Sequence, residues 1–172
     1  DNNSFGCLEK EKGNLLLALD HFKKALLIAK SVYKTIQHPF IAIVADNYGY
    51  TKLELKTYSE ARKYIELALS INRKSYRSTH PLVARSLNSL ARVYHLEGKL
   101  DLAQKYYFNA YDILFKKFGK NHPDILETRK NLLHLADQLN QEDAQANNPK
   151  NRLFSLKADA IYKKLNLSIN SI

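Results

Sequence analysis

Residues 80–123 read HPLVARSLNSLARVYHLEGKLDLAQKYYFNAYDILFKKFGKNHP, so the stretch begins and ends with a His-Pro pair. A third pair lies upstream, and the three histidines, His38, His80 and His122, are spaced 42 residues apart. A fixed period of this length is typical of a repeat array in which each repeat is one supersecondary unit. The rest of the chain is therefore aligned to these three pairs.

The composition favours a helical chain with a buried core. Hydrophobic residues make up 45% of the 172 residues, and only five Gly and four Pro interrupt the chain. No run of about 18 apolar residues occurs, so no membrane insertion is expected. The single cysteine, Cys7, excludes an internal disulfide and suits a reducing compartment, which favours the cytoplasm. The start, Asp1-Asn2-Asn3, has neither Met nor a signal-peptide pattern, so we expect a fragment of a longer protein.

Each His-Pro pair predicts the start of a helix. Proline is tolerated at the first helical position because its missing N–H is not needed there, and the residue before it avoids helical geometry. First helices are therefore expected at Pro39–Leu55, Pro81–Glu97 and Pro123–Leu139. A second helix should follow each of the first two after a short turn, at Tyr58–Tyr76 and Leu100–Phe118.

The two ends of the chain depart from this pattern. Apolar residues at helical spacing predict a helix over 15–36, preceded by a turn at Gly13-Asn14 and an ambiguous polar segment. Residues 141–150 are rich in Asn, Gln and Asp and are expected to form a loop. A last helix, Asn151–Leu165, with Phe154 on its apolar face, is expected to cover the end of the stack. In the alternative, that face packs on another chain and forms a homo-oligomer.

Six segments are expected in chain order. They are a partial first repeat (1–37), two complete repeats (38–79 and 80–121), the first helix of a divergent repeat (122–140), a polar loop (141–150), and a C-terminal capping helix with its tail (151–172).

Small residues recur at matched positions of the complete repeats, where Ala61 corresponds to Ala103 and Gly49 to Ala91. We expect two helices to approach closely at these positions.

Residues 80–123 resemble the tetratricopeptide repeat. The order small–Tyr–Gly–apolar–Ala–aromatic–Ala is carried by Ala91, Tyr94, Gly98, Leu100, Ala103, Tyr107 and Ala110. The usual unit has about 34 residues, and the longer unit here, with His-Pro at the joint and the segments LNSLARVY and GKNHP, resembles the kinesin light chain subtype. The match is good over 38–79, partial over 13–37 and weak beyond 135. The resemblance implies an all-α, right-handed superhelical solenoid of antiparallel helix hairpins that serves as a scaffold for protein–protein interactions.

The histidines do not predict a metal or catalytic site. His38, His80 and His122 lie one per repeat, so they should be about one repeat apart in space and act as structural joints. The other three have no paired Cys and no HExxH-type spacing, and no Gly-rich phosphate-binding motif or GxSxG occurs. We therefore expect no enzyme activity, no metal and no cofactor.

The groove formed by the stacked first helices is the expected binding site, because solenoids of this kind bind their partners there. By resemblance to tetratricopeptide folds, thirteen residues are assigned to it: Asp46, Asn47, Tyr50, Leu53, Arg85, Asn88, Ser89, Arg92, His95, Glu127, Lys130, Asn131 and His134. Three pairs in this set, Asp46-Asn47, Asn88-Ser89 and Lys130-Asn131, form a polar ladder whose short side chains suit the backbone of an extended peptide.

The side chains beside the ladder predict the kind of peptide. Four of them are basic or titratable: Arg85, Arg92, Lys130 and His134. Together with Tyr50 and Leu53 at one end, they favour a peptide with carboxylates and an apolar or aromatic anchor. Kinesin light chains bind acidic peptides with an aromatic anchor, so the resemblance implies the same ligand.

Other readings of the sequence remain open. In one alternative, the groove residues are solvated and bind no partner. In another, the chain's own tail covers them. The repeats are alternatively the peptide-sensing regulatory domain of a larger protein. The formal net charge of +10 and the 11 Tyr suit a nucleic-acid-binding helical repeat, although several of these tyrosines are expected in the core. The high Asn and Lys content hints at an AT-rich genome, such as that of a bacterium that delivers repeat proteins into the cytosol of a host cell.

Overall fold

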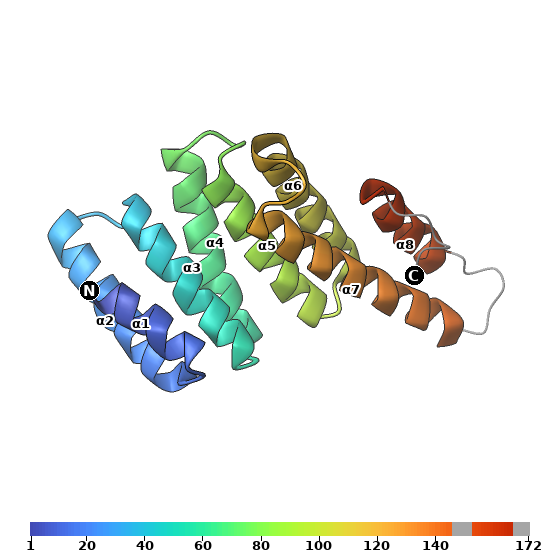
Figure 1. Cartoon of the computed structure of the whole chain (residues 1–172). Coiled ribbons are helices and arrows are strands. Elements are labelled where there is room, and N and C mark those ends of the chain that lie inside the picture. Colours follow the sequence, from blue (N-terminus) through green and yellow to red (C-terminus); the bar gives the residue numbers. More distant parts are fainter. Residues whose placement is uncertain (146–152, 167–172) are drawn as a thin grey trace.

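The computed structural model describes residues 1–145 and 153–166, and the regular secondary structure of these ranges is entirely α-helical. The helices are α1 (Asn2–Glu11), α2 (Leu15–Tyr33), α3 (Pro39–Glu54), α4 (Tyr58–Ser75), α5 (Pro81–Leu96), α6 (Leu100–Phe118), α7 (Pro123–Gln145) and α8 (Leu153–Lys164). Neighbours in the chain pair as hairpins, and the hairpins stack side by side (Figure 1). The predicted all-α solenoid of helix hairpins is confirmed. Within the described ranges, every helix is too short or too polar to cross a membrane.

Each His-Pro pair begins a first helix, and the histidine performs two structural tasks there. Nδ1 of His38 accepts a hydrogen bond from the backbone N–H of Phe40 at 3.2 Å, which caps α3. Its ring stacks on Tyr33, the last residue of α2, with 3.5 Å between the centroids. The same pair of contacts recurs at the other two joints, where the stacking partners are Tyr76 for His80 and Phe118 for His122. The histidines are therefore joint residues, as predicted.

At two matched positions the helices of a hairpin lie too close for a side chain larger than that of glycine. A Cβ on Gly49 of α3 would lie 2.8 Å from the Ile65 side chain of α4 and 3.0 Å from the backbone oxygen of Ala61. Gly6 of α1 has the same relation to Phe22 of α2, because a Cβ there would lie 2.5 Å from the ring. Both Gly6 and Phe22 precede their counterparts by 43 residues. The polar N-terminal segment, ambiguous in the sequence, is thus the counterpart of the C-terminal half of α3.

The C-terminal region differs from the expectation in one respect. Helix α7 continues to Gln145, so residues 141–145 are helical and the predicted loop is wrong there. This segment reads QEDAQ, which contains no Gly or Pro to end a helix. The side chain of Gln138 also donates to Glu142 at 3.0 Å, a favourable pair one turn apart. Residues 146–150 lie outside the described residues.

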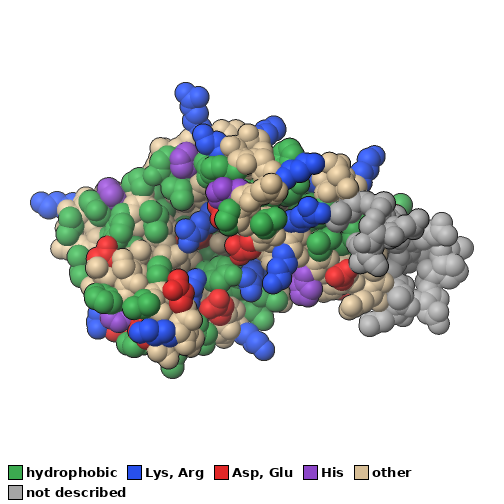
Figure 2. Space-filling model, in the orientation of Figure 1, with side chains coloured by type: hydrophobic (Ala, Val, Ile, Leu, Met, Phe, Trp, Pro, Cys, Tyr) green, Lys and Arg blue, Asp and Glu red, His purple; other side chains and the backbone are tan. Residues whose placement is uncertain are grey.

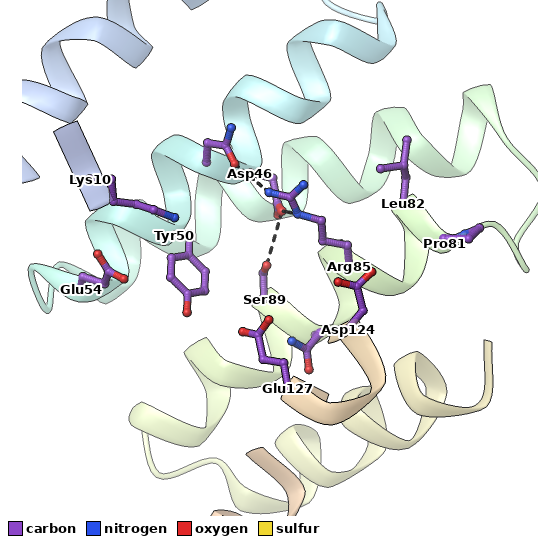
Figure 3. A pocket seen from close by; sticks show the side chains of 12 residues that line it. Lys10, Asp46, Tyr50, Glu54, Pro81, Leu82, Arg85, Ser89, Asp124 and Glu127 are labelled. Carbon is purple, nitrogen blue, oxygen red and sulfur yellow. Dashed lines mark hydrogen bonds and ion pairs between the residues drawn. The ribbon is translucent and has the colours of Figure 1, made fainter. Parts of the chain in front are cut away.

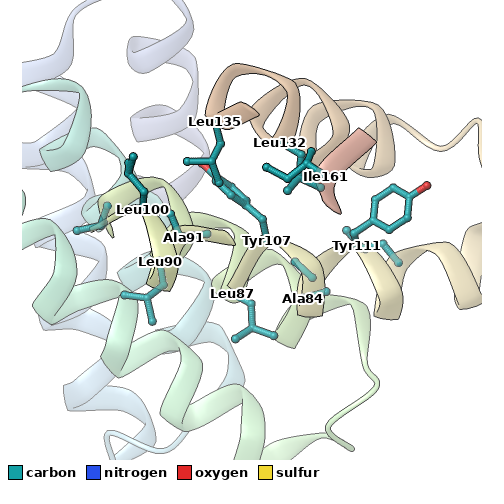
Figure 4. Close-up of a cluster of buried hydrophobic side chains, with 14 of the residues drawn as sticks. Ala84, Leu87, Leu90, Ala91, Leu100, Tyr107, Tyr111, Leu132, Leu135 and Ile161 are labelled. Atoms are coloured by element: carbon teal, nitrogen blue, oxygen red, sulfur yellow. The ribbon is translucent and has the colours of Figure 1, made fainter. Parts of the chain in front are cut away.

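Helix α8 packs on its own chain. Ala158, Ile161 and Leu165 are buried in the cluster that also holds the core side chains of α5, α6 and α7 (Figure 4). Lys157 and Lys164 form ion pairs with Asp101 and Asp112 of α6. The side chain of Phe154 lies outside the described residues. Three apolar residues of α8 are therefore buried against helices of the same chain, and the predicted homo-oligomer stays an alternative.

Candidate functional site

Two adjoining cavities open along the first helices α3, α5 and α7. The upstream pocket, between α3 and α5, has a volume of about 440 Å³, and the downstream pocket, between α5 and α7, has a volume of about 770 Å³. Tyr50 and Glu127 line both, so the two pockets form one groove. Figure 2 shows this hollow with acidic and basic side chains gathered around it.

The structure brings twelve of the thirteen predicted residues to this groove. Those in the upstream pocket are Asp46, Asn47, Tyr50, Arg85, Asn88, Ser89 and Glu127. The downstream pocket adds Arg92, His95, Lys130, Asn131 and His134. Their positions follow from the repeat, whereas their role in binding stays a prediction.

Leu53 does not line the groove, and its assignment is wrong. The side chain is 2% exposed and lies in the core cluster with Ala61 and Ile65. Leu53 is four residues after Gly49, so it lies on the face of α3 that packs on α4. The apolar surface of the groove comes instead from residues not predicted to lie there: Leu82, Leu96, Leu126 and Leu133.

The first rung of the predicted polar ladder is bonded within the protein. Nε of Arg85 lies 3.3 Å from Oδ2 of Asp46 (Figure 3), and Nη2 donates to Oδ1 of Asn47 at 2.8 Å. The amide of Asn47 donates in turn to Asn3 of α1 at 3.1 Å. Asp46 is 4% exposed, and burial raises the pKa of its carboxyl, against the opposing effects of Arg85 and Ser89. These side chains tie three first helices together, so Asn47 and Oδ2 of Asp46 are already engaged within the protein, whereas Oδ1 of Asp46 is buried without a hydrogen bond among the described residues.

Tyr50 stands at the boundary between the two pockets. Nζ of Lys10, from α1, lies 4.7 Å from the centre of its ring, and the guanidinium of Arg92 lies 5.0 Å from the same centre. Arg92 also donates a hydrogen bond to the Tyr50 hydroxyl. Burial raises the pKa of that hydroxyl, while Arg92 lowers it. Lys10 was missed because its helix could not be assigned from the sequence.

His95 is the buried titratable group of the downstream pocket. It is 7% exposed, and its Nε2 lies 2.9 Å from Oε1 of Gln138. Its ring lies 5.3 Å from that of His134 and meets Tyr107 edge-on. Burial lowers the pKa of His95, with a smaller contribution in the same direction from His134. No group of three or more His, Cys, Asp or Glu in the described part of the chain is arranged to hold a metal ion.

The two pockets differ in charge. The upstream pocket has four carboxyl groups, Asp46, Glu54, Asp124 and Glu127, against two cations. The downstream pocket has three cations, Arg92, Arg129 and Lys130, together with His134, against two carboxylates. The prediction of a basic groove therefore applies to the downstream half. Glu54, Asp124 and Arg129 lie on the predicted helices, but their spacing alone did not show which face they occupy.

Comparisons with known proteins identify the repeat and the fold. The family described as "Tetratricopeptide repeat" matches residues 40–114. The clustered mitochondria protein homolog of Xenopus tropicalis is 29% identical over 101 residues, which cover 59% of this chain and 8% of that protein. The chain therefore spans only a small part of this relative.

Two solved structures have the same fold. One is the putative kinesin light chain of Podosopora anserina with nearly identical TPR-like repeats (TM-score 0.67, 18% identity, 96% of this chain and 85% of that chain). The other is BtubC (BKLC) of P. vanneervenii (TM-score 0.65, 20% identity, 97% of this chain and 62% of that chain). At these identities the similarity shows the fold alone.

Proposed function

Residues 40–114 match the tetratricopeptide repeat family, and the chain has the fold of the kinesin light chain repeats. From this premise we propose that the chain is a non-catalytic interaction module that binds a peptide in the groove of α3, α5 and α7. Repeats of this kind mediate protein–protein interactions, and stacked hairpins expose a long surface suited to an extended segment. The partner is a protein or a peptide segment of one. Cys7 is a free, half-buried thiol, which suits the cytoplasm as the compartment of the interaction.

The downstream pocket carries this proposal. Arg129 and Lys130 form no ion pair within the described residues, so they are available to carboxylates of a ligand. Leu96 and Leu126 are exposed beside them and offer a surface for an apolar or aromatic anchor. A segment with carboxylates next to an apolar or aromatic side chain fits this combination.

The upstream pocket gives the peptide a direction. Glu54 and Glu127 are exposed and form no ion pair within the described residues. A second carboxylate-rich stretch in this half would be repelled, whereas neutral or basic residues would be accepted. The proposed ligand therefore has its acidic residues towards α7 and neutral or basic residues towards α1.

The test is selection from a library of short random-sequence peptides. We expect the wild type to select peptides enriched in Asp or Glu beside an aromatic or large apolar residue. The variant Arg129→Gln/Lys130→Gln should lose about tenfold in affinity for a selected peptide, the effect of roughly one charge-assisted contact. Arg73→Gln/Lys74→Gln is the matched control, because the same two residue types are exposed on α4 and lie outside the groove. The proposal fails if the wild type selects no peptide, or if both variants bind like the wild type.

A nucleic-acid-binding repeat has less support. The net charge of +10 suits an anionic partner, but the upstream half of the groove has more carboxyl groups than cations. If the chain is instead a peptide-sensing regulatory domain of a larger protein, the peptide binds in the same groove. The two functions then differ only in what peptide binding controls.

A further inference from the structure

We propose that the hydroxyl of Tyr107, with the side chains of Arg92 and Asn131, forms a subsite for one carboxylate of the ligand at the floor of the downstream pocket. The inference rests on the proposed peptide-binding function and names the group that the groove recognises most specifically. Tyr107 comes from a second helix, α6, and therefore lies beneath the first helices that form the walls of the groove.

Tyr107 has a polar atom where the two upstream hairpins have none. The matched residues are Phe22 in α2 and Ile65 in α4, both of them fully buried and apolar. Figure 4 shows the Tyr107 side chain between Ala91 of α5 and Leu135 of α7. Its ring performs the same packing task as the ring of Phe22. The hydroxyl is not needed for that task, which leaves its presence to be explained.

Two buried donors of residues that line the downstream pocket have no partner among the described residues. Tyr107 is 0% exposed, and its hydroxyl forms no hydrogen bond within the described residues. The side-chain nitrogen of Asn131 is buried and is likewise without a hydrogen bond there. Both residues line the downstream pocket. Since buried polar groups are nearly always hydrogen-bonded, the pocket favours a ligand group that accepts from both.

The excess of cations over carboxylates in the downstream pocket favours an anion as this group. Arg92 lines the same pocket as Tyr107, and its charge acts on the Tyr107 hydroxyl, as does the opposite charge of Glu127. Arg92 uses its guanidinium on the Tyr50 hydroxyl and ring, and its remaining N–H groups can serve a ligand. Burial raises the pKa of Tyr107, so the hydroxyl keeps its proton and donates. An ionised carboxylate is acceptor-only and suits such a set of donors.

The apolar rim of the pocket strengthens the contact. Leu96, Leu126 and Leu133 line the same cavity and reduce access of water once a peptide covers it. In such surroundings a hydrogen bond to a charged group is stronger than in water, and a missing partner is more costly. We therefore expect the Tyr107 hydroxyl to discriminate a carboxylate from the corresponding amide, rather than to contribute non-specific attraction.

The experiment is the substitution Tyr107→Phe in the full chain, with peptides taken from the library selection. The substitution removes one oxygen and keeps the ring, and Phe occupies the matched position of α2. We expect the melting temperature to stay the same or to rise, because an unpartnered buried hydroxyl is removed. The affinity for a selected acidic peptide should fall about tenfold. Tyr111→Phe is the matched control: it lies one turn further along α6 and does not line the groove.

A second series of peptides identifies the carboxylate. Each Asp or Glu of the selected peptide is replaced in turn by Asn or Gln, and the C-terminus is amidated in a separate peptide. One of these changes should weaken binding to the wild type about tenfold and leave binding to Tyr107→Phe unchanged. If that change is the amidation, the subsite takes a C-terminal carboxylate. If it is a side-chain replacement, the subsite takes Asp or Glu.

The outcomes separate this inference from the proposed function. If the wild type selects no peptide, the proposed function fails and this inference fails with it. If peptides are selected but the wild type, Tyr107→Phe and Tyr111→Phe bind them equally, only the subsite is refuted. Loss of binding by Tyr107→Phe together with a large fall in its melting temperature would also refute it, because a structural role would then explain the result.

Discussion

At the scale of single residues, one position in the sequence separates a groove residue from a core residue. Gly49 packs against Ile65 without room for a Cβ, and Leu53 lies one turn later on the same face of α3. Tyr50 is only one residue from Gly49, yet it points into the groove and is contacted by Lys10 and Arg92. Successive residues of a helix are rotated by about 100° around its axis, so adjacent side chains point to different faces of the helix.

Substitution of Leu53 by Ala tests this assignment. Removal of a fully buried leucine side chain should lower the free energy of unfolding by about 2–5 kcal/mol, measured by denaturant titration. Leu96→Ala is the control, because Leu96 is an exposed leucine of the groove, and it should change the stability by less than about 1 kcal/mol. Equal effects of the two substitutions would contradict the assignment of Leu53 to the core.

The buried His95 makes the stability of the protein depend on pH. Burial lowers its pKa below the ordinary 6.5, so the unfolded chain binds the proton more tightly than the folded one. Above pH 6.5 His95 is neutral in both the folded and the unfolded chain, and the protein has its full stability. As the pH falls from 6.5 through the lowered pKa of the folded state, the unfolded chain takes up the proton first and this stability is lost. We expect wild type to lose more stability than His95→Gln on acidification through this range, measured by denaturant titration at several pH values. Parallel curves for the two proteins would contradict this.

At the scale of helices and hairpins, the joints do more than start the first helices. At each joint a histidine caps the following helix through Nδ1 and stacks on an aromatic ring at the end of the preceding one. His38 lies five residues after its stacking partner Tyr33, whereas His80 lies four residues after Tyr76, yet both contacts are kept. Pro fixes the backbone where the cap is needed, and the ring fixes the next hairpin to the previous one.

His80→Ala should lose both contacts, whereas His80→Asn should lose only the stacking. An N-cap to Ala substitution costs about 0.5–2 kcal/mol, and a stacked aromatic pair contributes about 0.5–1.5 kcal/mol. We expect His80→Ala to be less stable than His80→Asn, with the wild type most stable, as measured by chemical denaturation. An alanine variant as stable as the asparagine variant would show that the cap contributes nothing.

At the scale of the whole molecule, the basic charge is spread out and the groove is polar along its length. The net charge of +10 includes no cluster confined to one end of the chain. Within the groove, carboxyl groups exceed cations upstream of Tyr50, and cations exceed carboxylates downstream. This arrangement suits a ligand of defined direction better than a uniformly charged polymer.

The charge distribution predicts weak and salt-sensitive binding to nucleic acid. In a gel-shift experiment with single-stranded RNA or duplex DNA, we expect any complex formed at low salt to disappear near about 150 mM salt at micromolar protein, because only a few phosphates would be contacted. An acidic peptide selected from the library should remain bound at that salt concentration. A nucleic-acid complex that persists there would favour the alternative function.

Much of the molecule follows from local sequence. The His-Pro pairs at 38, 80 and 122 determine where the first helices begin, since the backbone of Pro and the cap by the preceding residue are local effects. The 42-residue period then aligns equivalent side chains on successive helices, which is why twelve of the thirteen proposed residues line the groove. The end of α7 was missed because a polar composition was read as a loop, although no residue in 141–145 ends a helix.

Only the tertiary structure decided which groove side chains are free and which are already bonded. Arg85 meets Asp46 and Asn47, residues about one repeat away, and Lys10 reaches Tyr50 from a helix whose register the sequence did not reveal. The unpartnered hydroxyl of Tyr107 became visible only when α6 was placed beneath α5 and α7. The physical reason is that periodicity specifies the face on which a residue lies, whereas hydrogen bonds and ion pairs between repeats depend on how side chains meet across helices.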